Sequence, residues 1–219
     1  CSVTNIADRK SRQMIHKCKK LNPDACVVAA GCYVQNFGKD IAKELGADII
    51  LGNNKKNDLV PMVHEYFENM DKADGPILDF IDINKGSVDF ENMIIEKDSE
   101  HTRAFVKVQD GCNQFCSYCI IPFARGRIRS RDIDDVLKEV TTLSENGYKE
   151  MVITGIHLSS YGNGKDYDLA DLIEAVATVD KVERIRLGSL EPQIVTEDFA
   201  KRMAAISKMC PHFHLSLQS

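Results

Sequence analysis

Three cysteines crowd into one short segment of the chain. Cys112, Cys116 and Cys119 follow one another with the spacing CxxxCxxC. Three thiolates on a tight loop can each bind one iron of a 4Fe–4S cluster and leave the fourth iron without a protein ligand. Such an open iron can bind a small molecule through oxygen and nitrogen. The segment therefore predicts a cluster with one vacant coordination position.

Zinc is the main alternative for this segment. Structural zinc takes four closed ligands, usually from paired knuckles of the CxxC type. No fourth cysteine lies beside the three, and no histidine lies inside the loop. Disulfides are the other alternative, since the chain has eight cysteines. They are typical of small secreted domains, whereas this chain has 219 residues and no visible leader. The spacing favours iron.

The loop resembles the signature of radical S-adenosylmethionine enzymes, including the aromatic Tyr118 just before the third cysteine. The resemblance implies that the amine and carboxylate of S-adenosylmethionine chelate the open iron. One electron from the cluster then splits the cofactor into methionine and a 5′-deoxyadenosyl radical. Tyr118 would lie along the adenine, and its alternative role is packing within the loop.

Two further motifs narrow the resemblance to the methylthiotransferases. The run CNQFCSYCIIPFARGRIRSR from Cys112 is similar to theirs, as are CSVTNIADRKSRQMI from Cys1 and VVAAGCYVQN around Cys32. The runs TNIADRKSRQ and IIPFARGRIRSR look most like the members that modify threonylcarbamoyladenosine in tRNA. Alternatives are members that act on isopentenyl-adenosine in tRNA or on a ribosomal protein aspartate. An alternative of another class is a zinc-binding RNA module without catalysis.

The resemblance implies a second, auxiliary 4Fe–4S cluster in the full-length protein. Cys1 and Cys32 match two of its three cysteines, and the first normally lies upstream. We therefore expect this chain to bind the auxiliary cluster poorly or not at all. The implied reaction removes hydrogen from carbon-2 of the adenine and inserts sulfur associated with the auxiliary cluster. A second S-adenosylmethionine supplies the methyl group.

The implied partners are a tRNA and an electron donor of the flavodoxin or ferredoxin type, in the cytoplasm. No apolar run approaches the length of a membrane span. Cys18, Cys26 and Cys210 match no ligand position, and we expect them to be packed as small hydrophobes. The chain begins with cysteine and ends inside an expected strand, so we expect truncation at both ends.

Alternating strands and helices predict an α/β protein with two domains. Residues 1–72 read as a parallel-sheet domain with strands and helices, and residues 73–100 as a linker with one strand at 77–83. The expected helices of the first domain are 5–20, 38–45 and 57–70, and its expected strands are 25–30 and 48–51.

Residues 101–219 repeat strand and helix at the spacing of a TIM-like (β/α) barrel. The expected strands are 105–108, 151–154, 185–187 and 212–217, and the expected helices are 133–146, 169–179 and 197–208. We therefore predict a partial radical S-adenosylmethionine core domain. In such barrels the active site lies at the carboxyl ends of the strands.

Several residues near these strand ends are candidates for the cofactor pocket. Gly155 occupies the place of the family's methionine-contacting motif, where a glycine lets backbone approach a ligand. Ser189 and Glu191 follow the third barrel strand and could bond the ribose or amine, and Gln218 matches a family strand near the cofactor. Each could instead be a turn or cap residue. His157 could carry a proton, although a plain strand-end role is equally compatible with its position.

Arginine recurs at every second position after the cysteines, at Arg125, Arg127, Arg129 and Arg131. The net charge of −5 does not indicate a nucleic-acid binder, but a local patch can still steer a polyanion. In an extended loop this spacing places the arginines on one side, suited to RNA phosphates. One of them could instead pair with the cofactor carboxylate or a nearby acid.

Overall fold

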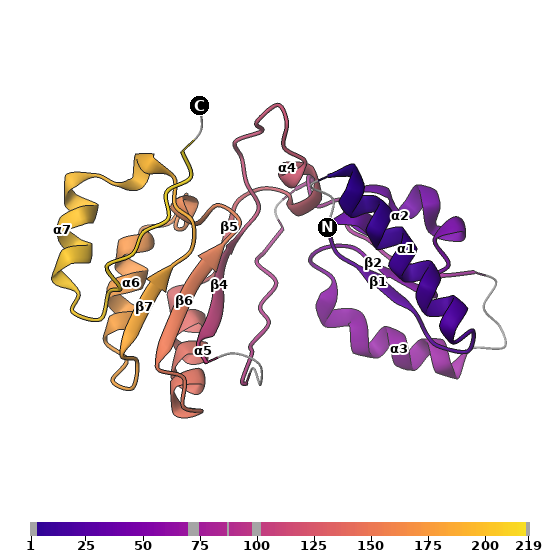
Figure 1. The fold of residues 1–219 in the computed structure, drawn as a ribbon, viewed down its shortest axis with the longest axis horizontal. Helices are drawn as coiled ribbons and strands as arrows, with labels where there is room; N and C mark the ends of the chain where they lie inside the picture. Colours follow the sequence, from indigo (N-terminus) through magenta and orange to yellow (C-terminus); the bar gives the residue numbers. More distant parts are fainter. Residues whose placement is uncertain (1–3, 70–74, 87, 98–101, 218–219) are drawn as a thin grey trace. The chain divides into compact units, whose positions relative to one another are not determined.

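The computed structural model describes residues 4–69, 75–86, 88–97 and 102–217, and the chain divides into two compact units (Figure 1). The first unit contains residues 1–91 and 113–127, and the second contains residues 92–112 and 128–219. These units are defined by contacts within the structure, whereas the predicted domains were defined from the sequence. The domain limits at residues 72 and 101 therefore stay a prediction.

The first unit is built on a three-stranded parallel sheet with the order β1–β2–β3. Its elements are α1 (Asn5–Leu21), β1 (Val28–Ala30), α2 (Cys32–Leu45), β2 (Ile49–Leu51), a 3₁₀ turn (Lys56–Asp58), α3 (Leu59–Glu68), β3 (Ile77–Asp79) and the short α4 (Ile121–Arg125). The alternation of strands and helices predicted for this region is confirmed.

Burial and capping explain why these residues fold in this way. All three residues of β2 are fully buried, as expected for a central strand of a parallel sheet that helices cover. The Thr4 hydroxyl accepts a hydrogen bond from the backbone N–H of Ala7 and so caps α1. Lys19 Nζ lies 2.7 Å from a carboxylate oxygen of Asp48, which links the end of α1 to the start of β2.

Two details of the first unit differ from expectation. Helix α2 begins at Cys32 instead of residue 38, because Gly31 takes a positive φ of +107° and ends the strand segment at once. The strand expected inside the linker is present as β3, and it pairs in parallel with β2. This part of the expected linker therefore completes the sheet.

The second unit contains a four-stranded sheet with the order β5–β4–β6–β7. Strands β4, β6 and β7 are parallel, and the short β5 is antiparallel to β4. Its elements are β4 (Ala104–Asp110), β5 (Arg129–Ser130), α5 (Ile133–Glu145), β6 (Glu150–Gly155), α6 (Leu169–Ala177), β7 (Arg184–Leu187), α7 (Glu197–Ala205) and 3₁₀ turns at Leu158–Ser160 and Pro192–Ile194. Parallel strands that neighbour one another in chain order, each followed by a helix, confirm the predicted start of a barrel (Figure 1).

The core of this unit lies between the parallel strands and the helices that follow them. It includes Val106 of β4, Ile153 of β6 and Ile185 of β7, which are fully buried, together with Val140 of α5 and Leu172 of α6. The strand expected at 212–217 is wrong in its extent. Leu215 makes a single parallel bridge with Leu190 beside β7.

Among the described residues, no helix combines the length and the apolar character that a membrane crossing requires.

The buried ion pair between Arg131 and Glu139 gives a stability prediction. Both side chains are 2% exposed, Arg131 donates to the Glu139 carboxylate, and the backbone N–H of Ile95 donates to Glu139 at 3.0 Å. Glu139→Ala leaves a buried guanidinium without this countercharge, so we expect a loss of about 3–5 kcal/mol in the free energy of unfolding. Urea denaturation measures it.

Glu145→Ala is the matched control, because Glu145 is exposed near the end of the same helix. A change within about 0.5 kcal/mol is expected there. Equal losses from the two variants would show that the pair does not stabilise the unit.

Candidate metal and cofactor site

The entry to the cysteine loop is fixed at the end of β4. Gln109 is fully buried, and its Nε2 donates to the carbonyl oxygens of Asp110 and Gly111 at 2.9 and 2.8 Å. The Asp110 carboxylate accepts from the backbone N–H of Gly111 at 2.8 Å. Gly111 has a φ of +74°, which turns the chain directly before Cys112. The backbone ahead of the first cysteine is therefore held on both sides.

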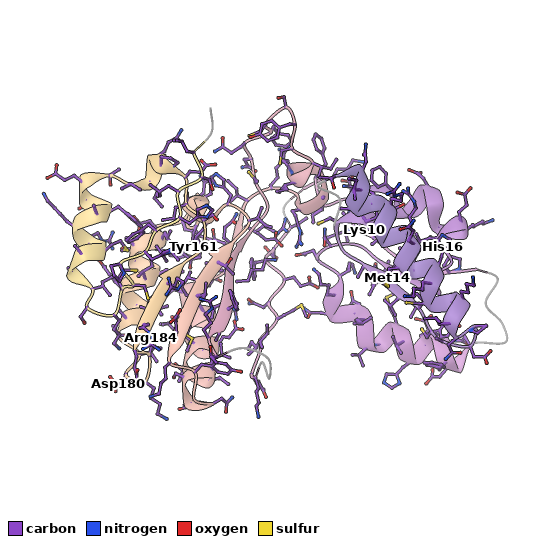
Figure 2. The ribbon with its side chains drawn as sticks, in the orientation of Figure 1. Lys10, Met14, His16, Tyr161, Asp180 and Arg184 are labelled. Carbon is purple, nitrogen blue, oxygen red and sulfur yellow. The ribbon has the colours of Figure 1, made fainter. Side chains whose placement is uncertain are left out.

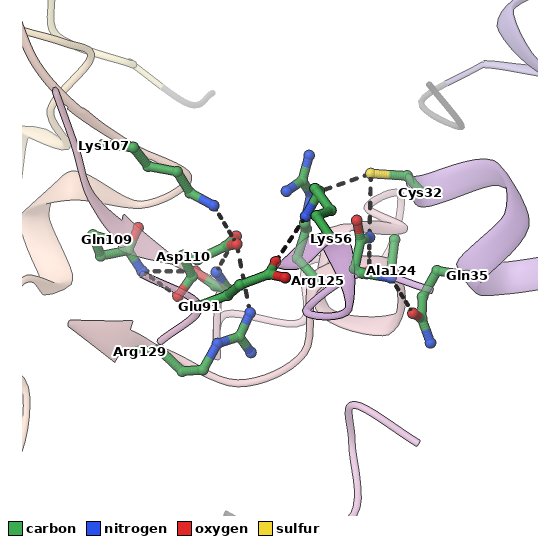
Figure 3. Close-up of polar contacts among 12 residues, drawn as sticks. Cys32, Gln35, Lys56, Glu91, Lys107, Gln109, Asp110, Ala124, Arg125 and Arg129 are labelled. Atoms are coloured by element: carbon green, nitrogen blue, oxygen red, sulfur yellow. Dashed lines mark hydrogen bonds and ion pairs between the residues drawn. The ribbon is translucent and has the colours of Figure 1, made fainter. Parts of the chain in front are cut away.

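Cations complete the surroundings of Asp110 (Figure 3). Lys107 Nζ lies 2.5 Å from its carboxylate, and an Arg129 Nη lies 3.5 Å from it. The Asp110 and Arg129 side chains are both less than a tenth exposed. Arg129 therefore acts inside the second unit as a partner of this acid.

Gln109 also joins β4 to the end of β6. Its Oε1 accepts from the backbone N–H of His157 at 2.7 Å. A Cβ added at Gly155 would lie 2.8 Å from the Cβ of Gln109 and 2.9 Å from its Oε1. The lack of a side chain at Gly155 therefore leaves room for the Gln109 side chain. Sequence reasoning missed Gln109, because the contacts of its amide with distant segments leave no pattern in the sequence.

The ends of β6 and β7 bring His157 and Glu191 together. His157 Nε2 lies 2.7 Å from Glu191 Oε1, and its Nδ1 lies 2.5 Å from the Ser160 hydroxyl. The backbone N–H of Glu191 donates to the Ser159 hydroxyl at 2.9 Å. Sequence reasoning found no partner for His157. The structure places Glu191 beside it, and this carboxylate is partly exposed.

Ser189 lies two residues before Glu191 in the segment that follows β7. Its hydroxyl is exposed and lies 2.7 Å from Nδ1 of His214. This contact connects the end of β7 to the segment beyond α7. Gln218, the remaining candidate for the cofactor pocket, lies outside the described residues.

The middle of the cysteine loop belongs to the first unit. The backbone N–H of Cys119 donates to the carbonyl oxygen of Cys116 at 2.9 Å, which closes a turn. Phe115 has a φ of +48° and packs edge-on against Phe123. Tyr118 is 76% exposed. Its position along an adenine ring stays a prediction from the resemblance.

The three thiols suit a cluster by number and type. Cys112 is buried, Cys119 half-buried and Cys116 exposed, and none of the described cysteines forms a disulfide. Cys112 is grouped with the second unit, and the other two are grouped with the first. Within the described ranges, no three His, Cys, Asp or Glu side chains are gathered closely enough to hold a metal ion.

Cys32, the described candidate for the auxiliary cluster, is the first residue of α2. Arg125 Nε donates to its sulfur at 3.2 Å, and Asn53 Nδ2 lies 3.8 Å from it (Figure 3). Asn53 is 1% exposed, and its Oδ1 is buried without a partner among the described residues. Two N–H donors at the sulfur fit an anionic sulfur group at this position. Cys1 lies outside the described residues.

The row of four arginines is not the one-sided loop that was expected. Helix α4 ends at Arg125, the first of the four, and β5 pairs with β4 at Arg129. Arg129 and Arg131 are buried beside Asp110 and Glu139. Their prediction as phosphate contacts therefore needs correction, because each meets an acid inside the protein. Arg127 is exposed and lies over the Phe115 ring at 4.4 Å.

Helix α1 presents a largely exposed, basic surface, on which Lys10, Met14 and His16 lie (Figure 2). Two of its other cations have partners within the first unit, since Arg12 donates to the Tyr33 hydroxyl at 3.2 Å and Lys19 pairs with Asp48. The expectation that Cys18 packs in the interior is wrong, because it is exposed on this helix.

Gly155→Ala tests the close approach of β4 and β6. We expect it to lower the free energy of unfolding by about 1–3 kcal/mol, because the added methyl must displace buried Gln109. Guanidinium denaturation provides the measurement. Gly188→Ala is the matched control, since its nearest neighbour would lie at 3.3 Å and be a hydroxyl. A loss at Gly155 no larger than at Gly188 would contradict this interpretation.

Two family profiles match the chain. The profile of the radical SAM superfamily matches residues 106–219, and that of an uncharacterized protein family, UPF0004, matches residues 1–52. A likeness to the solved radical S-adenosylmethionine methyltransferase TsrM from Kitasatospora setae has a TM-score of 0.63 at 16% identity. It covers 92% of this chain and 43% of that one. At this identity the likeness concerns the fold.

Curated relatives match along the whole chain. It is 39% identical to the threonylcarbamoyladenosine tRNA methylthiotransferase of Aquifex aeolicus and 38% identical to that of Bacillus subtilis, covering 52% and 48% of them. It is 35% identical to a tRNA-2-methylthio-N(6)-dimethylallyladenosine synthase of Clostridium novyi, covering 49%. The chain thus spans about half the length of these relatives. More than half of the residues lie inside the radical SAM profile, and the cysteine loop follows the first strand of the partial barrel. The chain therefore belongs to the radical SAM superfamily.

Proposed function

We propose that this protein is a tRNA methylthiotransferase that adds a methylthio group to carbon-2 of threonylcarbamoyladenosine beside the anticodon. The observation that carries the proposal is the similarity of the whole chain, with both cysteine motifs, to relatives named for this activity. The fold supports it, because each motif follows directly after a parallel strand.

Superfamily membership implies a 4Fe–4S cluster and S-adenosylmethionine. In this proposal Cys112, Cys116 and Cys119 hold the cluster, and Cys1 and Cys32 contribute to an auxiliary one in the full-length protein. The cluster with its bound cofactor supplies a radical that can remove a hydrogen atom from an unactivated position. The protein's own task is to position the groups and exclude water. Gln109 and Asp110 support it by fixing the backbone ahead of Cys112.

Five residues are proposed to contact S-adenosylmethionine. A carboxylate is a good acceptor for an amine or for ribose hydroxyls, and the partly exposed carboxylate of Glu191 lies 2.7 Å from His157 Nε2. His157 is thus proposed to orient Glu191. The other proposed contacts are Tyr118 along the adenine, the backbone at Gly155, the Ser189 hydroxyl and Gln218.

A tRNA is the proposed substrate, and its phosphates require cations on the surface of a chain with net charge −5. Arg127 is exposed beside the cysteine loop. Helix α1 adds exposed cations at Arg9, Lys10, Lys17 and Lys20. A tRNA substrate implies a cytoplasmic location, and the cluster implies an electron donor of the flavodoxin or ferredoxin type. The target base must leave its stack to be reached.

A second candidate substrate is dimethylallyladenosine in tRNA. The similarity of the whole chain to the Clostridium novyi synthase favours keeping it. The two substrates differ in chemistry, since threonylcarbamoyl carries a carboxylate and dimethylallyl is apolar.

The product of the reaction distinguishes these candidates. We expect the full-length gene to restore methylthio-threonylcarbamoyladenosine in a bacterium that lacks its own enzyme for this step. Mass spectrometry of digested tRNA measures the nucleoside. Cys116→Ala should abolish the product, because the cluster then loses one ligand, whereas Cys18→Ala, on exposed α1, should leave it unchanged.

Restored methylthio-dimethylallyladenosine instead would favour the second candidate. Unchanged tRNA with a well-expressed, iron-loaded protein would contradict the proposal.

A further inference from the structure

The sulfur of Cys32 lies among hydrogen-bond donors that come from separate segments of the first unit. Arg125 Nε, from α4, lies 3.2 Å from it, and Asn53 Nδ2, after β2, lies 3.8 Å from it. Cys32 also opens α2, a helix of 14 residues whose N-terminus carries partial positive charge. A guanidinium, an amide and a helix end thus all face one sulfur.

The position of Asn53 is fixed by its neighbours. Its Nδ2 also donates to the carbonyl oxygen of Ala124 at 2.6 Å, next to Arg125, and its backbone N–H donates to Gln35 Oε1 at 2.6 Å. Gly52, just before it, leaves room for the Gln35 amide, since an added Cβ would lie 2.6 Å from that oxygen. This network holds α4 and the segment after β2 at the start of α2 (Figure 3).

Such donors suit a sulfur that carries negative charge. A thiolate bound to an iron–sulfur cluster keeps much of its charge, and N–H donors to the sulfurs help to set the reduction potential of the cluster. Groups outside the ligand shell also orient the ligands themselves. Arg125 was expected at an RNA phosphate, but its Nε points to sulfur in this structure.

We propose that Arg125 and Asn53 are positioning residues of the auxiliary cluster: they hold the Cys32 sulfur through N–H donors, and Arg125 is not an RNA contact. The inference rests on the proposed function for the identity of the cluster. The contact itself can be tested in the metal-free chain.

The test compares two alkylating reagents at Cys32, anionic iodoacetate and neutral iodoacetamide. Both attack the same thiolate, so the ratio of their rates cancels thiolate content and reports the local electrostatic field. Peptide mass spectrometry gives the rates at Cys32, with exposed Cys18 as the internal reference. We expect Arg125→Gln to lower the ratio at Cys32 by about three- to tenfold, because a unit charge near the sulfur is lost.

Two further variants separate charge from structure. Arg125→Lys keeps the charge and should retain most of the ratio. Arg127→Gln removes a neighbouring charge that lies over Phe115, and should leave the ratio unchanged. An unchanged ratio in Arg125→Gln, or an equal fall in Arg127→Gln, would overturn the contact. A loss of tRNA affinity in Arg125→Gln as large as in Arg127→Gln would overturn the statement about RNA.

The role toward the cluster is tested in the full-length protein with Cys112, Cys116 and Cys119 replaced by alanine, so that only the auxiliary cluster can form. Arg125→Gln should shift its midpoint potential to a more negative value, and Arg125→Lys should shift it less. Equal potentials would overturn the positioning role. Absence of iron from this protein would instead count against the proposed function, while the alkylation result would stand.

Discussion

Three thiols on one loop can share a cluster only if the chain enters the loop in a fixed direction, and buried Gln109 imposes that direction. Its amide bonds two successive carbonyl oxygens ahead of Cys112 and the backbone of His157, which lies just after the neighbouring strand β6. A buried amide is stable only when its polar atoms find partners. The fold of β4 against β6 and the start of the loop are therefore set by the same side chain.

Both cysteine motifs have the same local backbone arrangement. A parallel strand ends, a glycine with positive φ turns the chain, and cysteine follows at once, as Gly31–Cys32 after β1 and Gly111–Cys112 after β4. Only glycine adopts this backbone conformation without strain. This arrangement places a thiol at the carboxyl end of a parallel strand, where ligands of α/β folds generally bind. Cationic side chains lie beside both motifs: Lys107 and Arg129 pair with Asp110, which precedes the second motif, and Arg125 donates to the Cys32 sulfur.

The regular elements of both units could be predicted from periodicity and from glycine positions, because long amphipathic helices and buried strands leave strong patterns. Helix α4 was missed, since five residues are too few for a period, although Pro122 lies in its first turn and Gly126 follows its last residue. Strand β5 was missed because a two-residue edge pairing leaves no pattern.

Some residues of the candidate site could likewise be predicted from the sequence, and others could not. The cysteines follow from spacing, whereas Gln109, Asn53 and the partners of Arg129 and Arg131 follow from contacts between distant segments. A spacing of two indicates one side of a chain only where the chain is extended. Sequence alone could not show that two of the four arginines turn inward toward acids.

The vacant iron of a cluster held by Cys112, Cys116 and Cys119 is the claim on which the chemistry depends. The most direct measurement is anaerobic reconstitution with iron and sulfide, followed by electron paramagnetic resonance of the reduced protein with and without S-adenosylmethionine. A 4Fe–4S signal that changes when the cofactor is added is the predicted result. Zinc in place of iron, or a cluster signal that the cofactor leaves unaltered, would contradict it.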